Sequence, residues 1–259
     1  MNIPIVNLDS SQVVDIAKKA GNAIMEIYKR DFDIYEKSDK SPLTEADLAS
    51  HKVIVNGLRE LTPDLPVLSE ESSQEEVGGR MNWQTYWLID PLDGTKEFIK
   101  KNGEFTVNIA LVHQNKTVFG VVDATALEVT YWGGKDVGSC KLENNTEKSI
   151  KVANKKQNTK DMKIVGSRSH QSPEFIGFIA DYPGAEIVSM GSSLKLCLVA
   201  EGSADLYPRL GLTFEWDTAA SQAVVEGAGG SVISLEDDMP LNYNTKEDTL
   251  LNPYFLVLS

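Results

Sequence analysis

The stretch Trp87–Phe98 constrains the fold more than any other part of this chain. Its first residues are aromatic and apolar, which predicts a buried strand that ends at Asp90-Pro91. The following Asp93-Gly94 pair is typical of a turn, and Thr95–Ile99 then predicts a short helix. The local pattern is therefore strand, tight turn and helix, as in α/β proteins.

This turn also brings oxygen donors together. Asp90 and Asp93 lie three residues apart, so both carboxylates can face one point, and the Leu92 carbonyl between them is free of a strand ladder. Three hard oxygen donors beside a helix N-terminus suit a divalent cation that holds a phosphate. Turn propensity alone also explains Asp, Pro and Gly here, so other acidic residues must support the metal hypothesis.

Composition narrows the function classes. The 259 residues are 41% hydrophobic, which predicts one large domain or two smaller ones with a substantial core. A net charge of -13 repels nucleic acid and anionic lipid, so an anionic substrate would need metal ions and a local basic pocket. With only Cys140 and Cys197 the chain has no disulfide framework, which fits a reducing cytosol, and we expect both side chains to serve in packing. Neither an export signal nor an apolar run of membrane-spanning length is visible.

The N-terminal part combines two helices with acidic residues at turns. Apolar residues recur at helical spacing from Val13 to Ile27, after the capping candidates Ser10 and Ser11. Thr44 begins a second helix with Asp47 at its third position, which by itself indicates a capping box. A strand at 66–69 runs into Glu70, and the polar residues 72–80 predict a mobile surface loop.

The middle of the chain predicts an antiparallel sheet. Phe105, Val107, Ile109 and Leu111 alternate strictly, which predicts a strand with one buried face, and strands near 118–122, 128–132 and 138–142 extend a meander. The polar residues 154–161 suggest a domain boundary, so we expect an α+β domain over 1–157 and an α/β domain over 158–259. In the second domain, Asp217 opens an Ala-rich helix and has a simple alternative role as its N-cap.

Three motifs together resemble the inositol monophosphatase-like superfamily of magnesium-dependent, lithium-sensitive phosphomonoesterases. They are Pro66-Val-Leu-Ser-Glu-Glu71, Asp90-Pro-Leu-Asp-Gly-Thr95 and Trp216-Asp-Thr-Ala-Ala220. Within it, the chain is similar to the bacterial 3′(2′),5′-bisphosphate nucleotidases of the CysQ type, through Asp93–Lys100, Ser167–His170, and Gly191–Lys195 with Leu206–Arg209. The resemblance implies a layered α-β-α-β-α sandwich.

The resemblance also implies a metal site and a catalytic group. Two or three Mg²⁺ ions, with Li⁺ as inhibitor, would be held by Glu70, Asp90, the Leu92 carbonyl, Asp93 and Asp217. One ion would lower the pKa of a water and another would stabilise the leaving oxygen. Glu70 and Thr95 would orient the attacking water, and Asp47 would accept a proton through the Thr95 hydroxyl.

Substrate binding is expected from both halves of the chain. The reacting phosphate would contact Glu70, Leu92, Asp93, Gly94, Thr95 and Asp217, with the amides of Gly94 and Thr95 at a helix N-terminus. Ser192 and Lys195, on one face of a first helical turn, and Arg209 would hold a second phosphate, with His170 near the adenosine. An ordinary solvated surface is the alternative for Lys195 and Arg209.

The expected function is hydrolysis of the 3′-phosphate of adenosine 3′,5′-bisphosphate to AMP, a step of sulfate assimilation, and some relatives also accept the sulfated nucleotide. An inositol or sugar phosphatase is the alternative enzyme, but such relatives usually carry Thr-Asn where this chain has Lys96-Glu97. A non-catalytic nucleotide sensor on the same fold is the alternative of another class. We expect a cytoplasmic monomer or homodimer, with peripheral association at the inner membrane suggested by resemblance alone.

Overall fold

The computed structural model describes residues 9–32, 34–36, 42–73, 75–154, 156–167 and 172–259. Two long helices come first, α1 (Ser10–Tyr28) and α2 (Glu45–Leu61), and the short strands β1 (Ile34–Glu36) and β2 (Pro42–Thr44) pair antiparallel before α2. The Asp9 carboxylate caps α1 by accepting the Ser11 N–H, so the predicted caps Ser10 and Ser11 are wrong.

A seven-stranded sheet forms the centre of the molecule. Its strands follow chain order, with the first pair parallel and all later pairs antiparallel, so the predicted meander is confirmed. Its last strand lies in a polar stretch that the sequence did not assign to the sheet. The strands are β3 (Val67–Ser69), β4 (Thr85–Asp93), β5 (Thr106–His113), β6 (Lys116–Ala124), β7 (Val129–Gly134), β8 (Gly138–Glu143) and β9 (Thr146–Ile150).

A mixed five-stranded sheet follows in the second half, in the order β11-β10-β12-β14-β13. Its strands are β10 (Lys163–Ser167), β11 (Glu186–Met190), β12 (Leu206–Arg209), β13 (Ser231–Ser234) and β14 (Phe255–Leu258). The remaining helices are α3 (Thr95–Ile99), α4 (Pro173–Ile179), α5 (Leu194–Ala200) and α6 (Ala219–Gly227). The described residues also form the 3₁₀ turns η2 (Arg80–Asn82), η3 (Thr125–Leu127), η4 (Thr159–Asp161) and η5 (Glu215–Asp217).

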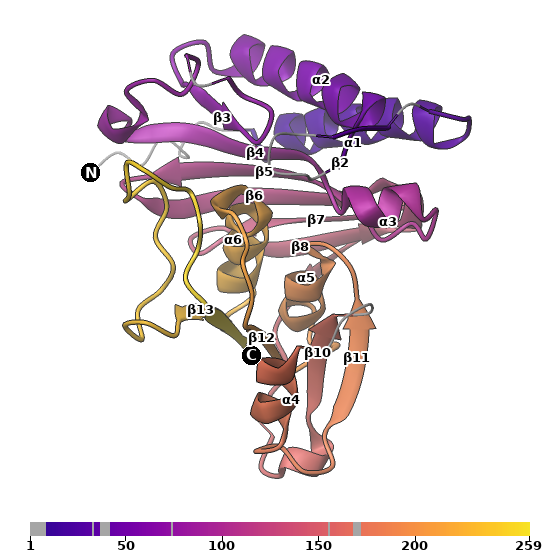
Figure 1. Cartoon of the computed structure of the whole chain (residues 1–259), viewed down its shortest axis with the longest axis vertical. Coiled ribbons are helices and arrows are strands. Elements are labelled where there is room, and N and C mark those ends of the chain that lie inside the picture. Colours follow the sequence, from indigo (N-terminus) through magenta and orange to yellow (C-terminus); the bar gives the residue numbers. More distant parts are fainter. Residues whose placement is uncertain (1–8, 33, 37–41, 74, 155, 168–171) are drawn as a thin grey trace.

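These elements stack as α-β-α-β-α layers, which confirms the predicted sandwich (Figure 1). One core joins α1 and α2 to the large sheet, and a second joins the other face of that sheet to α5, α6 and the small sheet. A third, smaller core lies between the small sheet and α4, around Ile164, Phe175 and Leu206. The second core takes residues from both halves of the chain, while the predicted division between residues 157 and 158 stays a prediction.

The prediction that β5 has one buried face is wrong, because all but its last residue is buried. Val107 and Ile109 face the core of α1 and α2, whereas Ala110 and Val112 face the core of α5 and α6. The polar residues Thr106 and Asn108 therefore lie inside the molecule and not on a solvent face. The backbones of β6 and α6 also lie close together, since a Cβ on Gly120 of β6 would lie 2.2 Å from the Ala220 carbonyl oxygen of α6.

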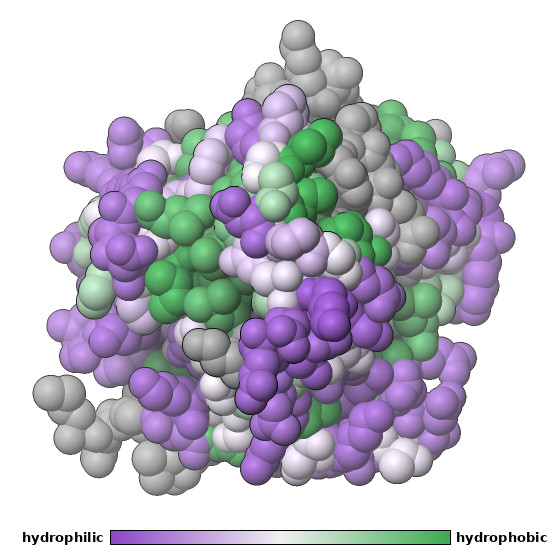
Figure 2. Space-filling model, turned by 90° about the horizontal axis from the view of Figure 1, so that it is seen from below, coloured by the Kyte–Doolittle hydropathy of each residue, from purple (hydrophilic) through white to green (hydrophobic). Residues whose placement is uncertain are grey.

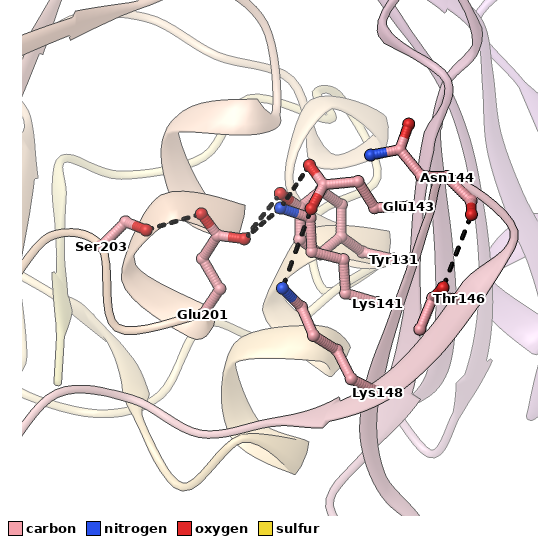
Figure 3. A network of polar contacts seen from close by, with 8 residues as sticks. All are labelled: Tyr131, Lys141, Glu143, Asn144, Thr146, Lys148, Glu201 and Ser203. Carbon is pink, nitrogen blue, oxygen red and sulfur yellow. Dashed lines mark hydrogen bonds and ion pairs between the residues drawn. The ribbon is translucent and has the colours of Figure 1, made fainter.

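A partly buried polar network joins the C-terminal end of α5 to the large sheet (Figure 3). Lys141 of β8 forms ion pairs with Glu201 at 2.8 Å and Glu143 at 3.0 Å, and the Tyr131 hydroxyl donates to Glu201 at 3.0 Å.

Seen from below, the surface carries mainly polar side chains with apolar areas between them (Figure 2). Within the described residues, no helix combines the length and the apolar character that crossing a bilayer requires.

Candidate active site

The site begins where β4 leaves its regular pairing with β5. Asp90 pairs with Asn108 and Asp93 with Thr106, and the register shifts between these pairs. Pro91 has no N–H for a ladder, and its carbonyl accepts the Ser50 hydroxyl of α2 at 2.6 Å. The strand therefore continues to Asp93 through an irregular segment, so its predicted end at Asp90-Pro91 is wrong, although the local disruption by Asp-Pro was foreseen.

The turn after β4 requires glycine. Gly94 has φ +91°, and a Cβ there would lie 3.1 Å from the Glu104 carbonyl oxygen. Thr95 begins α3, as the sequence predicted. Its hydroxyl oxygen lies 3.4 Å from both Asp47 Oδ1 and the Leu92 carbonyl oxygen. This turn thus places the Thr95 hydroxyl between a carboxylate and a carbonyl.

Asp47 has the two contacts expected of a residue that caps and also faces the site. Its Oδ2 accepts the Thr44 N–H at 2.8 Å and the Thr44 hydroxyl at 2.6 Å, which completes the predicted capping box of α2. Its Oδ1 is directed at Thr95. The carboxylate is 2% exposed, so α2 holds one orientation of it against α3.

Three carboxylates meet beside this turn. Asp90, Asp93 and Asp217 each offer an oxygen atom within 4.8 Å of the others. Burial, together with the negative charges of Glu70, Asp93 and Asp217, raises the pKa of Asp90 well above its ordinary value. Burial and the charges of Asp93 and Glu70 likewise raise the pKa of Asp217 to about 8. The cluster therefore strongly favours a bound cation.

Glu70 lies at the end of β3, next to the end of β4. Its N–H donates to the Ile89 carbonyl at 3.2 Å, so the parallel pairing of β3 with β4 continues to the residue before Asp90. Its charge acts on both Asp90 and Asp217. The expected position of Glu70 at a strand end beside Asp90 is thus confirmed, although it is not among the three carboxylates that lie within 4.8 Å of one another.

Asp217 arrives on the 3₁₀ turn η5, whereas Thr218 is the residue that precedes α6. The prediction that Asp217 opens the Ala-rich helix is therefore wrong by two residues. Its Oδ2 accepts the Phe214 N–H at 2.8 Å, which closes η5 and fixes the carboxylate. The capping alternative holds for the turn but does not remove Asp217 from the acidic cluster.

Two serines bind Asp93 from the opposite side. Asp93 Oδ2 lies 2.6 Å from the Ser192 hydroxyl, the Ser193 hydroxyl and the Ser193 N–H. Ser192 has φ +54°, a strained backbone for a non-glycine residue, and precedes α5. The prediction that Ser192 shares the first turn of a helix with Lys195 is therefore wrong, because α5 begins at Leu194 and Ser192 faces Asp93 instead.

Sequence reasoning missed the residues behind these serines. Thr106 lies 2.7 Å from the Ser192 hydroxyl, and the Asn108 amide donates to the Ser193 hydroxyl at 2.8 Å. Glu104, which is 8% exposed, accepts the Gly191 N–H at 2.8 Å. The signal was present as polar residues alternating with apolar ones along β5, but that pattern equally predicts a solvent face.

Two cations line the same cavity as the acidic cluster. Lys195 and Arg209 face a pocket that also contains Asp93, Gly94, Glu97 and Asp217. Lys195 Nζ donates to the Ser192 carbonyl at 2.7 Å, and Arg209 Nη2 donates to the Leu212 carbonyl at 2.6 Å. The buried Arg209 Nε has no hydrogen-bond partner. His170, expected near the adenosine, lies outside the described residues.

The donor set fits a divalent metal ion. It consists of carboxylate oxygens, with the Leu92 carbonyl nearby, and Asp90 is only 1% exposed. Hard oxygen donors suit Mg²⁺ better than soft transition metals, and mutual repulsion of buried carboxylates is relieved by a cation. The same pocket also carries two positive charges, so a phosphorylated molecule held by a metal at Asp93 and Asp217 could also contact Lys195 and Arg209.

Comparisons with known proteins identify the family and its relatives. Residues 9–256 match the model of the Inositol monophosphatase family. The chain is 48% identical to the 3′(2′),5′-bisphosphate nucleotidase CysQ of Escherichia coli K12, covering 95% of this chain and 98% of the relative. It is 38% identical to the Haemophilus influenzae protein of the same name, covering 96% and 91%.

Solved structures show the same fold. The crystal structure of CysQ from Bacteroides thetaiotaomicron matches with a TM-score of 0.83, 41% identity and coverage of 97% of each chain. The extragenic suppressor protein suhB from Bartonella henselae matches with a TM-score of 0.77 over 96% of this chain and 93% of that one, at 24% identity. At that identity the second match supports the fold alone.

Proposed function

The chain belongs to the inositol monophosphatase family, and we propose that it is a magnesium-dependent 3′(2′),5′-bisphosphate nucleotidase that removes the 3′-phosphate of adenosine 3′,5′-bisphosphate to give AMP. The observation that carries this proposal is one pocket lined both by Asp93 and Asp217 of the acidic cluster and by the cations Lys195 and Arg209. This arrangement suits a substrate with two phosphates. The nucleotidase relatives support the choice of nucleotide. The corresponding role would be disposal of this nucleotide during sulfate assimilation.

Glu70, Asp90, Asp93, Asp217 and the Leu92 carbonyl would hold two or three Mg²⁺ ions. Bound Mg²⁺ would activate a water molecule and neutralise negative charge at the phosphate and at the leaving oxygen. Asp90, Asp93 and Asp217 would bind together, because each offers an oxygen atom within 4.8 Å of the others. Li⁺ would inhibit by occupying part of this oxygen site.

The attacking water would be oriented by Glu70 and the Thr95 hydroxyl. Thr95 Oγ1 would accept a proton from the water and pass its own proton to Asp47 Oδ1, 3.4 Å away. The Thr44 contacts to Asp47 Oδ2 leave Oδ1 as the oxygen that faces Thr95. The N–H groups of Gly94 and Thr95 would bind the oxygens of the reacting phosphate.

Lys195 and Arg209 would bind the phosphate that is not cleaved. Lys195 would exchange its contact with the Ser192 carbonyl for the phosphate, and Arg209 could offer its unpaired Nε as well as a terminal nitrogen. Within the described part of the chain, neither side chain forms an ion pair with a carboxylate. Both charges therefore remain available to a substrate.

The first experiment compares phosphate release from adenosine 3′,5′-bisphosphate and from inositol 1-phosphate. Each substrate is assayed with Mg²⁺, with a chelator, and with Mg²⁺ plus Li⁺. We expect Mg²⁺-dependent, Li⁺-sensitive release from the nucleotide and little from the inositol ester. Preference for the inositol ester would overturn the substrate assignment, and nucleotide binding without release would favour the sensor.

A second experiment tests whether Lys195 and Arg209 bind the phosphate that is not cleaved. Lys195→Ala and Arg209→Ala should each raise KM for the bisphosphate about 10- to 100-fold, because each removes a charge-assisted hydrogen bond. Hydrolysis of p-nitrophenyl phosphate, which has no second phosphate, should change little. Lys100→Ala is the matched control, since this lysine is exposed just after α3. Equal losses on both substrates would contradict the assignment.

The cytoplasmic location and the oligomeric state, a monomer or a homodimer, stay predictions.

A further inference from the structure

The segment between β13 and β14 connects two parts of the site that are far apart in the sequence. In Figure 1 this yellow segment runs from the small sheet up beside α6 to the level of the large sheet. Its central residue, Asn244, is 2% exposed and has φ +55°, a conformation that asparagine tolerates. Burial and this backbone conformation together fix the orientation of the Asn244 side chain and of its N–H.

On one side, Asn244 binds Arg80. The Asn244 Nδ2 donates to the Arg80 carbonyl at 2.7 Å, and Arg80 Nη1 donates to Asn244 Oδ1. Arg80 Nη2 donates to the carbonyls of Lys246 and Glu247 at 2.7 and 2.8 Å. Arg80 ends the loop that begins after Glu70. The predicted surface loop is confirmed for residues 73, 75, 76, 78 and 79, which are exposed, but is wrong at Arg80, which is 7% exposed.

On the other side, Asn244 binds the turn that carries Asp217. Its N–H donates to Glu215 Oε2 at 2.7 Å, and Glu215 is 3% exposed. Two residues further along η5, Asp217 joins the acidic cluster. A continuous set of buried contacts thus runs from the loop after Glu70, through Arg80, Asn244 and Glu215, to Asp217.

We infer that Arg80, Asn244 and Glu215 are positioning residues that set the spacing between the Glu70 and Asp217 ends of the metal site. The inference rests on the proposed function for the role of that site. Glu70 is placed by the pairing of β3 with β4, whereas Asp217 lies on a three-residue turn. The separation of the two residues therefore depends on the contacts that hold η5 against the large sheet and the loop after β3. Side-chain contacts that orient metal ligands typically change metal affinity 10- to 100-fold when removed.

The most informative variants separate the two sides of Asn244. Asn244→Gly removes the contacts with Arg80 but keeps the Asn244 N–H for Glu215, and glycine accepts the positive φ. Glu215→Ala removes the acceptor on the Asp217 side, whereas Glu215→Gln keeps an oxygen acceptor of the same size. Asn244→Gly and Glu215→Ala should weaken metal binding, and Glu215→Gln should largely restore it.

The test measures Mg²⁺ binding by calorimetry and by the Mg²⁺-induced rise in Tm, both without substrate. We expect a tenfold or larger increase in Kd for Asn244→Gly and Glu215→Ala, and a change within threefold for Glu215→Gln. In activity assays, the half-saturating Mg²⁺ concentration should rise in parallel while KM for the nucleotide at saturating Mg²⁺ stays within twofold. The binding measurement remains valid even if the proposed substrate is wrong.

Tyr131→Phe is the control for a general loss of stability, because it removes one hydrogen bond of the separate network in Figure 3. It should lower Tm without changing the Kd for Mg²⁺. The inference is overturned if Asn244→Gly and Glu215→Ala lower Tm as Tyr131→Phe does but bind Mg²⁺ with the affinity of the native chain. If Glu215→Ala does not fold, a Glu215→Gln protein with a tenfold weaker Kd would also contradict it, since that variant retains the acceptor.

Discussion

Replacing Asp217 with asparagine should stabilise the metal-free protein at neutral pH and weaken its response to metal. Asp217 has an ordinary pKa of 3.8 and a folded-state pKa raised to about 8, by burial and by the charges of Asp93 and Glu70. Because the folded state disfavours the ionised form, stability is highest below pH 4 and falls as the pH rises towards 8. Asparagine is neutral throughout, and its side-chain oxygen can still accept the Phe214 N–H.

The magnitude follows from the pKa difference. At pH 7 only the part of the rise between 3.8 and 7 counts, which corresponds to about 4 kcal/mol at 1.36 kcal/mol per pKa unit. Asp217 is only partly buried and faces the pocket, so solvent reduces this to about 2 kcal/mol. For a chain of this size, that free energy raises Tm by about 5 °C. With Mg²⁺ present the order should reverse, since the variant lacks one anionic metal ligand.

The assay is thermal unfolding of the native chain and Asp217→Asn at pH 4, 6 and 8, in chelator and in Mg²⁺. In chelator, the Tm advantage of the variant should be absent at pH 4 and largest at pH 8. Asp136→Asn, an exposed change of the same type, should show no such trend. A variant that is less stable than the native chain in chelator at pH 8, or that gains as much from Mg²⁺, would refute the electrostatic argument.

Three further substitutions test other parts of the structure. Gly120→Ala should destabilise by more than about 3 kcal/mol or prevent folding, because its Cβ would meet a backbone carbonyl of α6 at 2.2 Å; a native-like Tm would contradict this packing. Glu201→Gln should cost about 2 kcal/mol in urea unfolding, since Lys141 keeps only one carboxylate partner; an unchanged midpoint would show that the pair adds no stability. Thr44→Ala should cost about 1 kcal/mol of stability through loss of the helix cap, and it should lower kcat because Asp47 is no longer held. Thr44→Ser should retain both the stability and kcat. A normal kcat in Thr44→Ala would argue against a role of Asp47 in catalysis.

The parts of the site that the sequence could predict depend on local chemistry. The capping box of Thr44 and Asp47, the disruption at Asp90-Pro91 and the turn at Gly94 are all decided within a few residues. The order of strands in the large sheet follows the same logic, because each strand pairs with the next along the chain. Motif resemblance added Asp217, which no local pattern could bring to Asp90.

The parts that could not be predicted depend on what covers each element. Alternation along β5 is compatible with solvent or with a polar interior on its second face, and only the packing of α5 and α6 decides between them. The helix start near Ser192 could not be placed because its positive φ is held by contacts with Asp93 and Thr106, which lie on other strands. Burial of Arg80 likewise depends on a segment more than 160 residues later in the chain.

The same long-range contacts explain why the acidic cluster can exist in a folded chain at all. Asp93 is held by three donors from Ser192 and Ser193, and the Ser193 hydroxyl also lies 2.8 Å from the Asp217 carbonyl. These hydrogen bonds hold the Asp93 carboxylate in place close to those of Asp90 and Asp217. The second half of the chain therefore both supplies a carboxylate and holds another in place. A Ser193→Ala variant should in consequence weaken the docking of η5 on β4, because it removes the hydroxyl that contacts both Asp93 and the Asp217 carbonyl. Thermal unfolding of the metal-free protein would detect this as a lower Tm, and an unchanged Tm would contradict the role of Ser193.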